Sequence, residues 1–291
     1  RRLFGIPIGA VVAAEPADLS LLHALFYVHS AGKLDLLLST DKGAQKERFV
    51  TGAQPVAEGL LRLGGPRLEL GRAVRRIEQA AEGVVVSGDG FEARSQRVVV
   101  AIPPTLAGRI DYLPALPAAR DQLTQRVPQG SVIKCFAIYE EPFWRRQGLT
   151  GQSVFDEGPV HVTFDASPPS GSPGILMGFL EGNAARKLAD RPEASRREVV
   201  LRCFAKIFGE RAARPVRYTD RVWASEPFSR GCYVGYFPPG AWTSLGSALR
   251  RPVGRIHWAG TETATVWNGY FDGALQAGER AAREVLEELE R

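Results

Sequence analysis

The residues best suited to chemistry lie in the stretch 229–240, which has the sequence SRGCYVGYFPPG. Cys232 and Tyr233 stand side by side between glycines, and Tyr236 follows before a pair of prolines. A thiolate is a nucleophile, and the electron-rich face of a phenol attracts cations. Glycine permits close backbone approaches, and proline restricts the chain. The pattern predicts a rigid loop that presents these groups, although an aromatic turn that closes a core has a similar pattern.

Lys134 is a second candidate, because it lies within the apolar stretch 130–139, GSVIKCFAIY. This stretch predicts a strand, and charged side chains are rarely buried there unless they are paired. Burial readily lowers the pKa of a lysine, which suits it to proton transfer. The alternative is a lysine at a strand edge whose ammonium group extends to solvent. The adjacent Cys135 is expected to be a small buried apolar residue.

The elements that must position these residues follow from apolar spacing and from turn residues. Helices are predicted at residues 17–31, 54–63, 191–208 and from about 269 onward. The packed face of the last helix should contain Ala274, Leu275, Ala277, Ala281, Ala282, Val285 and Leu286. Strands are predicted across 68–100, with turns at 82–83 and 88–90, and at 130–139, 175–180 and 256–259. The apolar run Val98–Val100 is typical of a strand that is buried on both faces.

Composition indicates a soluble globular protein of one large domain or two ordinary ones, with 291 residues of which 44% are hydrophobic. The 37 basic and 32 acidic residues are scattered, which argues against nucleic-acid binding. The three cysteines and four histidines have neither disulfide nor metal-ligand spacing, so no metal and a cytoplasmic location are predicted. No apolar run approaches the ~20 residues of a membrane helix, so no membrane anchor is predicted.

Several motifs occur in an order that resembles the flavin-dependent monoamine oxidase family. They are GCY at residues 231–233, GSVIKC at 130–135, EPFWR at 141–145, AIPPTL at 101–106 and AGTETAT at 259–265. The resemblance runs from about residue 24 to the end and is more specific than any single motif. The dinucleotide-binding pattern G-x-G-x-x-G, which family members carry near their N terminus, is absent. We therefore expect the C-terminal part of such an enzyme, roughly two-thirds of its length.

The resemblance implies an α/β fold, the FAD-linked amine oxidase fold, without its N-terminal Rossmann βαβ segment. It assigns residues 1–49 and 124–225 to a substrate-binding domain that contains a mixed sheet. It assigns residues 50–123 and 226–291 to the FAD-binding domain.

The family reaction converts an amine to an imine, which water hydrolyses to an aldehyde, while O2 is reduced to H2O2. The resemblance thus implies FAD as the cofactor, a small amine and O2 as partners, and a homodimer as a candidate assembly. In some members a cysteine thioether holds the flavin 8α-methyl group, and Cys232 occupies that position. The other implied cofactor contacts are Val74 through its backbone, Trp223, Gly260, Thr261, Glu262, Tyr270 and Phe271.

The resemblance also implies the residues that handle the substrate. Tyr233 and Tyr270 would stand on either side of the amine, and Lys134 would lie near the flavin N5 through a water molecule. Leu38 and Gln45 would border the substrate passage, and Phe164 and Phe179 would line the cavity. Taken without the resemblance, Leu38 fits core packing, Gln45 fits a solvated loop, and the tyrosines fit core aromatics.

Two alternatives remain open at this point. One is another oxidase of the same fold that acts on polyamines or L-amino acids, which would need a charged residue in the cavity. The sequence offers no lone charge that we assign there. The other is an inactive, truncated product without bound FAD. The absent dinucleotide pattern favours it, whereas Lys134, Cys232, Tyr233 and Tyr270 together argue against it.

Overall fold

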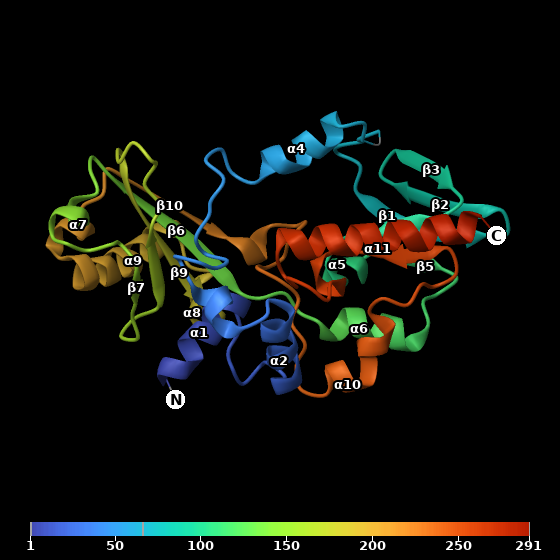
Figure 1. The fold of residues 1–291 in the computed structure, drawn as a ribbon, viewed down its shortest axis with the longest axis horizontal. Helices are drawn as coiled ribbons and strands as arrows, with labels where there is room; N and C mark the ends of the chain where they lie inside the picture. Colours follow the sequence, from blue (N-terminus) through green and yellow to red (C-terminus); the bar gives the residue numbers. More distant parts are fainter. Residues whose placement is uncertain (1, 66, 291) are drawn as a thin grey trace. The chain divides into compact units, whose positions relative to one another are not determined.

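A computed structural model of the chain describes residues 2–65 and 67–290 (Figure 1). The chain divides into two compact units, each made of separated segments. Unit 1 comprises residues 1–21 and 128–239, and unit 2 comprises residues 22–127 and 240–291. Within the described residues, no helix has both the length and the apolar character to cross a membrane.

Unit 1 is built on a five-stranded sheet with the order β10-β6-β9-β8-β7. All its neighbouring strands are antiparallel, whereas a mixed sheet was predicted for the substrate-binding domain. Strands β7, β8 and β9 follow one another through short connections, and a parallel pair would need a longer crossover. The strands are β6 (Val132–Tyr139), β7 (Ser153–Val154), β8 (Val162–Asp165), β9 (Gly174–Glu181) and β10 (Arg217–Val222).

The two faces of this sheet have different neighbours. One face packs against α9 (Glu193–Phe208) and includes Cys135, which is fully buried as predicted, in one cluster with Phe204. The other face carries Lys134 opposite Phe179, and Glu181 lies two residues further along β9. Because side chains alternate along a strand, β6 and β9 separate the core from a face that carries charged residues.

The remaining helices of unit 1 are short and lie at the ends of strands or at the start of the chain. They are α1 (Arg2–Val12), α7 (Phe143–Arg146), α8 (Gly182–Leu188), η1 (Glu210–Ala213) and η2 (Trp223–Ser225). The stretch 229–240 forms a loop between η2 and α10, in agreement with the sequence prediction.

Unit 2 contains a four-stranded sheet with the order β3-β2-β1-β5 and a two-stranded sheet of β4 and β11. The predicted turns at 82–83 and 88–90 connect antiparallel strands, whereas β4 and β11 are parallel. The strands are β1 (Val74–Ala80), β2 (Gly83–Gly88), β3 (Phe91–Ser95), β4 (Val98–Val100), β5 (Asp111–Leu113) and β11 (Ile256–Trp258).

The helices of unit 2 include three of the four predicted from sequence, while the fourth is α9 of unit 1. Predicted and found are α2 (Leu21–Ser30), α4 (Gln54–Arg62) and α11 (Phe271–Leu289). The others are α3 (Leu34–Leu38), α5 (Pro104–Ala107), α6 (Ala118–Arg126), α10 (Ala241–Leu245), η3 (Gly246–Ala248) and η4 (Thr261–Thr263).

Burial of β4 differs from the prediction. Val98 and Val100 pack into one cluster with Ile256, but Val99 is 40% exposed. The prediction that both faces of this strand are buried is therefore wrong for the part of the chain that the structure describes. A continuous apolar run does not by itself reveal how many faces of a strand are covered.

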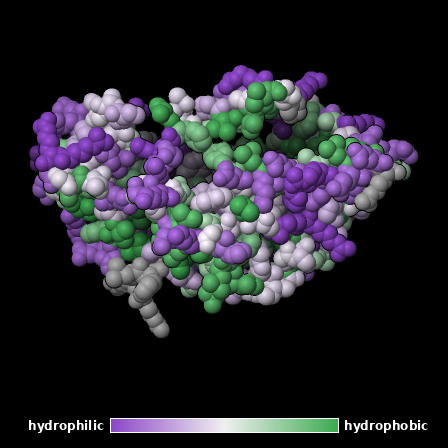
Figure 2. Space-filling model, in the orientation of Figure 1, coloured by the Kyte–Doolittle hydropathy of each residue, from purple (hydrophilic) through white to green (hydrophobic). Residues whose placement is uncertain are grey.

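The packed face of α11 also differs from the prediction. Ala277 and Ala281 are buried as expected, but Leu275 and Leu286 are exposed. The helix instead turns Arg280 and Glu284 toward β11, where they bond to its backbone and to His257. Hydrophilic residues dominate the visible side of α11 in Figure 2. Polar contacts thus take the place of part of the predicted apolar face.

The compact units do not coincide with the predicted domains. Residues 22–49 belong to unit 2 and residues 226–239 belong to unit 1, which is the reverse of their predicted assignment. Compactness does not reveal which segment binds a cofactor, so the functional assignment of the domains stays a prediction.

Candidate functional site

The loop that carries Cys232 and Tyr233 is fixed by its glycine. Gly231 has a φ of +143°, and a Cβ at this position would lie 2.5 Å from the carbonyl oxygen of Gly130. The backbone N–H of Cys232 donates to that same oxygen at 2.9 Å, and the peptide bond between Cys232 and Tyr233 is cis. The side chains of Cys232 and Tyr233 are half-buried, whereas Tyr236, which was expected to be presented, is buried.

Lys134 lies on the sheet face that this loop covers. Its ammonium nitrogen is 5.5 Å from the ring centre of Phe136 and 5.3 Å from that of Phe179. Such distances allow an attraction between the cation and the ring faces. The side chain is half-buried, and β6 lies between β10 and β9, so Lys134 does not lie on an edge strand of the sheet.

The aromatic residues predicted in this region come together in unit 1. The Phe179 ring lies edge-on to Phe164 at 6.0 Å and to Tyr233 at 6.0 Å. Trp223, Cys232 and Tyr233 pack against the same cluster as Phe179. One surface of unit 1 therefore gathers every predicted site residue that this unit contains.

The thiol of Cys232 responds to two opposing influences. Burial raises its pKa to about 11, and the nearby positive charge of Lys134 acts in the opposite direction. A cation close to a thiol favours the thiolate, which is the nucleophilic form. Burial is the larger influence, so the thiol is protonated near pH 7 and the charge of Lys134 only moderates that effect.

Tyr233 has a partner that the sequence analysis missed. Its hydroxyl donates to Oε1 of Glu181 at 3.1 Å. Glu181 is 3% exposed, and burial raises the pKa of its carboxyl group to about 8. Glu181 is thus an acidic residue beside Tyr233 that the sequence analysis did not assign to the site. The signal was present, because Glu181 ends an apolar run in the same way that Lys134 interrupts one.

In unit 2, Tyr270 stands at the start of α11 beside Tyr27 of α2. Their ring centres are 6.4 Å apart, and the phenol of Tyr270 is hydrogen-bonded to the side chains of Tyr27 and Gln45. Burial raises the pKa of Tyr270, and both hydrogen bonds act in the opposite direction. The indole of Trp267 lies 5.3 Å away at an angle of 75°.

The segment after α3 brings Gln45 to this position. The side-chain amide of Gln45 also donates to the carbonyl oxygen of Leu37 at 3.1 Å, which ties the loop back to the helix. Leu38 is half-buried at the end of α3. The structure thus joins Gln45 to Tyr270, whereas the predicted role of Leu38 in the substrate passage stays a prediction.

The turn Gly260-Thr261-Glu262 follows β11 at the carboxyl end of the parallel pair. Gly260 has a φ of +94°, a conformation that favours glycine. The hydroxyl of Thr261 donates to the carbonyl oxygen of Tyr270 at 3.0 Å and accepts from the N–H of Gly269 at 2.7 Å. This residue therefore fastens the turn to the N-terminus of α11, where Phe271 begins the helix.

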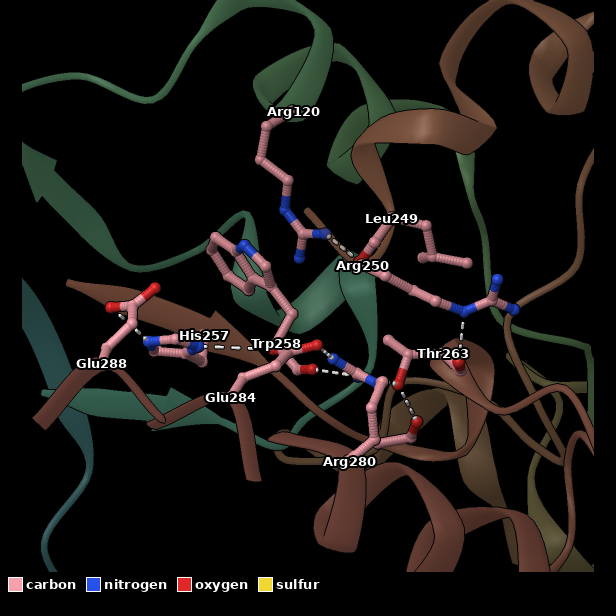
Figure 3. A network of polar contacts seen from close by, with 10 residues as sticks. Arg120, Leu249, Arg250, His257, Trp258, Thr263, Arg280, Glu284 and Glu288 are labelled. Carbon is pink, nitrogen blue, oxygen red and sulfur yellow. Dashed lines mark hydrogen bonds and ion pairs between the residues drawn. The ribbon is translucent and has the colours of Figure 1, made fainter. Parts of the chain in front are cut away.

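Three arginines contact the residues next to this turn (Figure 3). Arg280 donates to the carbonyl oxygen of Trp258 and to the hydroxyl of Thr263, and Arg250 donates to the carbonyl oxygen of Thr263. The Arg120 guanidinium carbon lies 3.4 Å from the ring centre of Trp258. These contacts tie β11, η4 and α11 into one framework.

Val74 lies apart from this turn. It begins β1 and packs at the edge of the cluster that contains Val100 and Trp258, the last residues of the parallel strands. Val74 and Trp258 thus belong to the same apolar cluster, and the predicted backbone contact of Val74 with a cofactor stays a prediction.

Comparison with known proteins finds similarity to flavin-containing amine oxidases. Residues 9–286 match the family described as flavin containing amine oxidoreductase. The chain is 44% identical over 280 residues to "Probable flavin-containing monoamine oxidase A" of Dictyostelium discoideum, covering 96% of this chain and 61% of the relative. It is 43% identical over 290 residues to "Amine oxidase [flavin-containing] B" of Homo sapiens, covering 98% of this chain and 56% of the relative.

Solved structures have the same fold. Cyclohexylamine oxidase from Brevibacterium oxydans IH-35A superposes with a TM-score of 0.91 at 33% identity, covering 100% of this chain and 64% of that one. A triple mutant of putrescine oxidase superposes with a TM-score of 0.93 at 30% identity, covering 99% and 64%. The predicted amine oxidase fold is therefore confirmed, and the chain spans less than two-thirds of the length of these proteins.

Proposed function

The chain belongs to the flavin-containing amine oxidoreductase family, whose cofactor is FAD, and we propose that the protein carrying it oxidises a small amine. The family match over residues 9–286 is the observation that carries this proposal. When bound, FAD supplies the acceptor for the electrons of the amine and its α C–H bond. The expected products are an imine that water converts to an aldehyde, and H2O2 from O2.

The residues of unit 2 fit the flavin. Gly260 leaves room at the carboxyl end of β4 and β11, where a Cβ would meet no atom closer than 3.6 Å. Ligands of α/β proteins commonly bind at such strand ends. Ile102 and Phe271, which are 37% and 55% exposed, offer apolar surface for a ring system. We assign Gly260, Thr261, Phe271 and, as their immediate neighbours, Glu262 and Tyr270 to the cofactor.

The N-terminus of α11 supports this assignment. The first N–H groups of a helix carry partial positive charge, which stabilises an anion placed before them. Thr261 holds the turn against that end of the helix through Tyr270. This arrangement would favour the negative charge of a reduced flavin. Val74 and Trp223 complete the proposed cofactor contacts.

Tyr233 and Tyr270 are proposed to face the amine. The electron-rich faces of two phenols favour an amino group and orient it for reaction. Each ring is restrained by its own neighbours, Tyr233 by Phe179 and Tyr270 by Trp267. Restrained rings are what orientation requires, because a freely rotating ring would not fix the position of a substrate.

Lys134 is proposed to assist proton movement and the reaction of reduced flavin with O2. The rings of Phe136 and Phe179 hold its ammonium group in an apolar setting on β6. Phe164, Phe179, Leu38 and Gln45 are proposed to line the path of the substrate.

Cys232 is proposed to attach the flavin covalently through its sulfur. The position of Cys232 within the motif GCY supports this assignment, and the nearby charge of Lys134 partly offsets the burial that disfavours the thiolate. Precipitating the purified protein with acid should leave the yellow flavin in the pellet. The Cys232→Ala variant should release it into the supernatant, whereas Cys203→Ala, which changes a buried cysteine of the α9 core, should not. Release of flavin from the unaltered protein would contradict covalent attachment.

The function is tested by supplying the flavin-loaded protein with monoamines, diamines and L-amino acids and measuring H2O2. We expect turnover of monoamines at rates well above those of the other two classes. Turnover of L-amino acids alone would contradict the proposal. O2 as the acceptor is tested in the same assay, while a homodimer and a cytoplasmic location stay predictions from the sequence.

A further inference from the structure

We propose that Glu181 is a positioning residue for amine oxidation, because it holds the hydroxyl of Tyr233 and thereby fixes the ring that faces the substrate. This inference rests on the proposed function, since it assigns Glu181 a task only if Tyr233 contacts the amine. It adds to the proposed site a residue that acts through another side chain.

The geometry places Glu181 where it can control Tyr233. Glu181 is the last residue of β9 and lies opposite Val132 in the register of β6 and β9. It shares a sheet face with Phe179, two residues earlier. Its Oε1 accepts the hydrogen bond from the Tyr233 hydroxyl at 3.1 Å.

Two contacts therefore fix the ring of Tyr233. Phe179 meets it edge-on, with ring centres 6.0 Å apart and an angle of 69°. Glu181 holds the hydroxyl at the far end of the same ring. The edge contact alone restrains the ring weakly, whereas a hydrogen bond at the hydroxyl fixes its direction. Together they restrain both the plane and the tilt of the phenol.

The burial of Glu181 has no evident structural reason. Burying a carboxyl group is unfavourable unless its oxygens are paired. Oε2 of Glu181 is buried and has no hydrogen-bond partner among the residues that the structure describes. The start of α8 is held by another acid, Glu15, whose Oε1 accepts a hydrogen bond from the backbone N–H of Asn183 at 2.7 Å. Glu181 is therefore not needed to cap this helix. The contact with Tyr233 is thus the interaction that Glu181 contributes.

The charge of Glu181 is also suited to this task. Its raised pKa, about 8, keeps the carboxyl neutral near pH 7. The titratable groups on the surrounding elements include Lys134 of β6, Cys232 of the loop, Glu15 in the segment between α1 and α2, and His161 just before β8. A neutral acid accepts the hydrogen bond without placing a negative charge beside the amine. Such a charge would stabilise the ammonium form, which carries no lone pair to assist oxidation.

The test compares Glu181→Gln with Glu181→Leu in the flavin-loaded protein. Glutamine keeps the acceptor oxygen and the shape, so kcat should stay within about threefold of the unaltered protein. Leucine removes the acceptor, so kcat should fall about tenfold while KM changes by less than about threefold. Glu15→Gln is the matched control and should leave kcat and KM unchanged. Flavin content and the thermal midpoint establish that each variant is folded.

A double-mutant cycle with Tyr233→Phe separates positioning from a general structural effect. Phenylalanine cannot donate the hydrogen bond, so adding Glu181→Leu to Tyr233→Phe should lower kcat by less than about twofold. A full tenfold loss in that background would overturn the inference, as would an unchanged kcat in Glu181→Leu alone. If the unaltered protein oxidises no amine, the proposed function fails and this inference fails with it. Turnover together with an unaffected Glu181→Leu variant overturns the inference only.

Discussion

Tyr27 supports Tyr270 in the way that Glu181 supports Tyr233, by holding the hydroxyl of a phenol. Tyr27→Phe removes the hydrogen bond with Tyr270. We expect unfolding stability to fall by about 1 kcal/mol and amine turnover to fall severalfold, since the Tyr270 ring loses one restraint. Urea unfolding and H2O2 release measure the two effects.

Tyr112→Phe is the matched control for this change. Tyr112 is also in unit 2, and its hydroxyl donates to the carbonyl oxygen of Ala107 at 3.0 Å. The control should lose similar stability and keep its activity. Equal losses of activity in both variants would show that the Tyr27 effect is a general consequence of a weaker unit 2.

Glu181 also makes stability depend on pH. Its pKa is about 8 in the folded protein and near the ordinary value of 4.5 in the unfolded chain. Between these values the folded protein holds a proton that the unfolded chain has released. Stability therefore falls as pH rises through this range, by roughly 5 kcal/mol in total. Below about pH 4.5 the carboxyl group is protonated in both states, so this loss of stability is absent and the protein has its full stability there.

Glu181→Gln removes this dependence and isolates it from all other titrating groups. The thermal midpoints of variant and unaltered protein should be similar near about pH 5, and the variant should be clearly more stable near about pH 9. A constant difference between the two proteins across this range would mean that Glu181 does not retain its proton.

Single residues were predictable from sequence where their chemical type conflicts with their neighbours. Lys134 among apolar residues is such a case, and Glu181 could have been found by the same rule. Tyr27 could not, because a tyrosine on the apolar face of a helix looks like core. Its partnership with Tyr270 joins residues far apart in the chain, which spacing does not reveal.

At the scale of elements, α11 depends on the glycine just before it. Gly269 has a φ of +88°, and a Cβ there would lie 2.8 Å from the hydroxyl oxygen of Tyr27. Gly269→Ala should lower stability by about 1–3 kcal/mol and reduce amine turnover, since it strains the backbone and displaces Tyr27. Thermal unfolding and the amine assay test this.

Gly278 offers a matched control in the same helix. A Cβ at Gly278 would meet no atom within 4 Å, and its φ is not positive. Gly278→Ala should raise stability by about 0.5–1 kcal/mol and leave turnover unchanged, because alanine is the better helix former. If both alanine variants were destabilised alike, the conformation of Gly269 would not be the cause.

Elements were predictable where the local pattern alone decides the structure. The turns of the β1–β3 meander and the end of α9 at Gly209 agree with the sequence prediction. The packed face of α11 and the burial of Val99 do not. Both features depend on which residues pack against the element. For α11, these are polar groups of β11 and η4, which contact Arg280 and Glu284.

At the scale of the whole molecule, the chain alternates between its units, and each contains separated segments. The parallel pair of β4 and β11 joins residues 98–100 to residues 256–258. No local signal specifies such a pairing, although the family resemblance predicted the fold that contains it. The positions where the chain passes between compact units were also not visible in composition.

The most direct test of the central claim is to add a monoamine without oxygen to the purified, flavin-loaded protein and record its visible spectrum. We expect the oxidised flavin band to bleach as the amine is consumed and to return when O2 is admitted, with release of H2O2. A bound flavin whose spectrum stays unchanged with every amine would contradict the proposed amine oxidation.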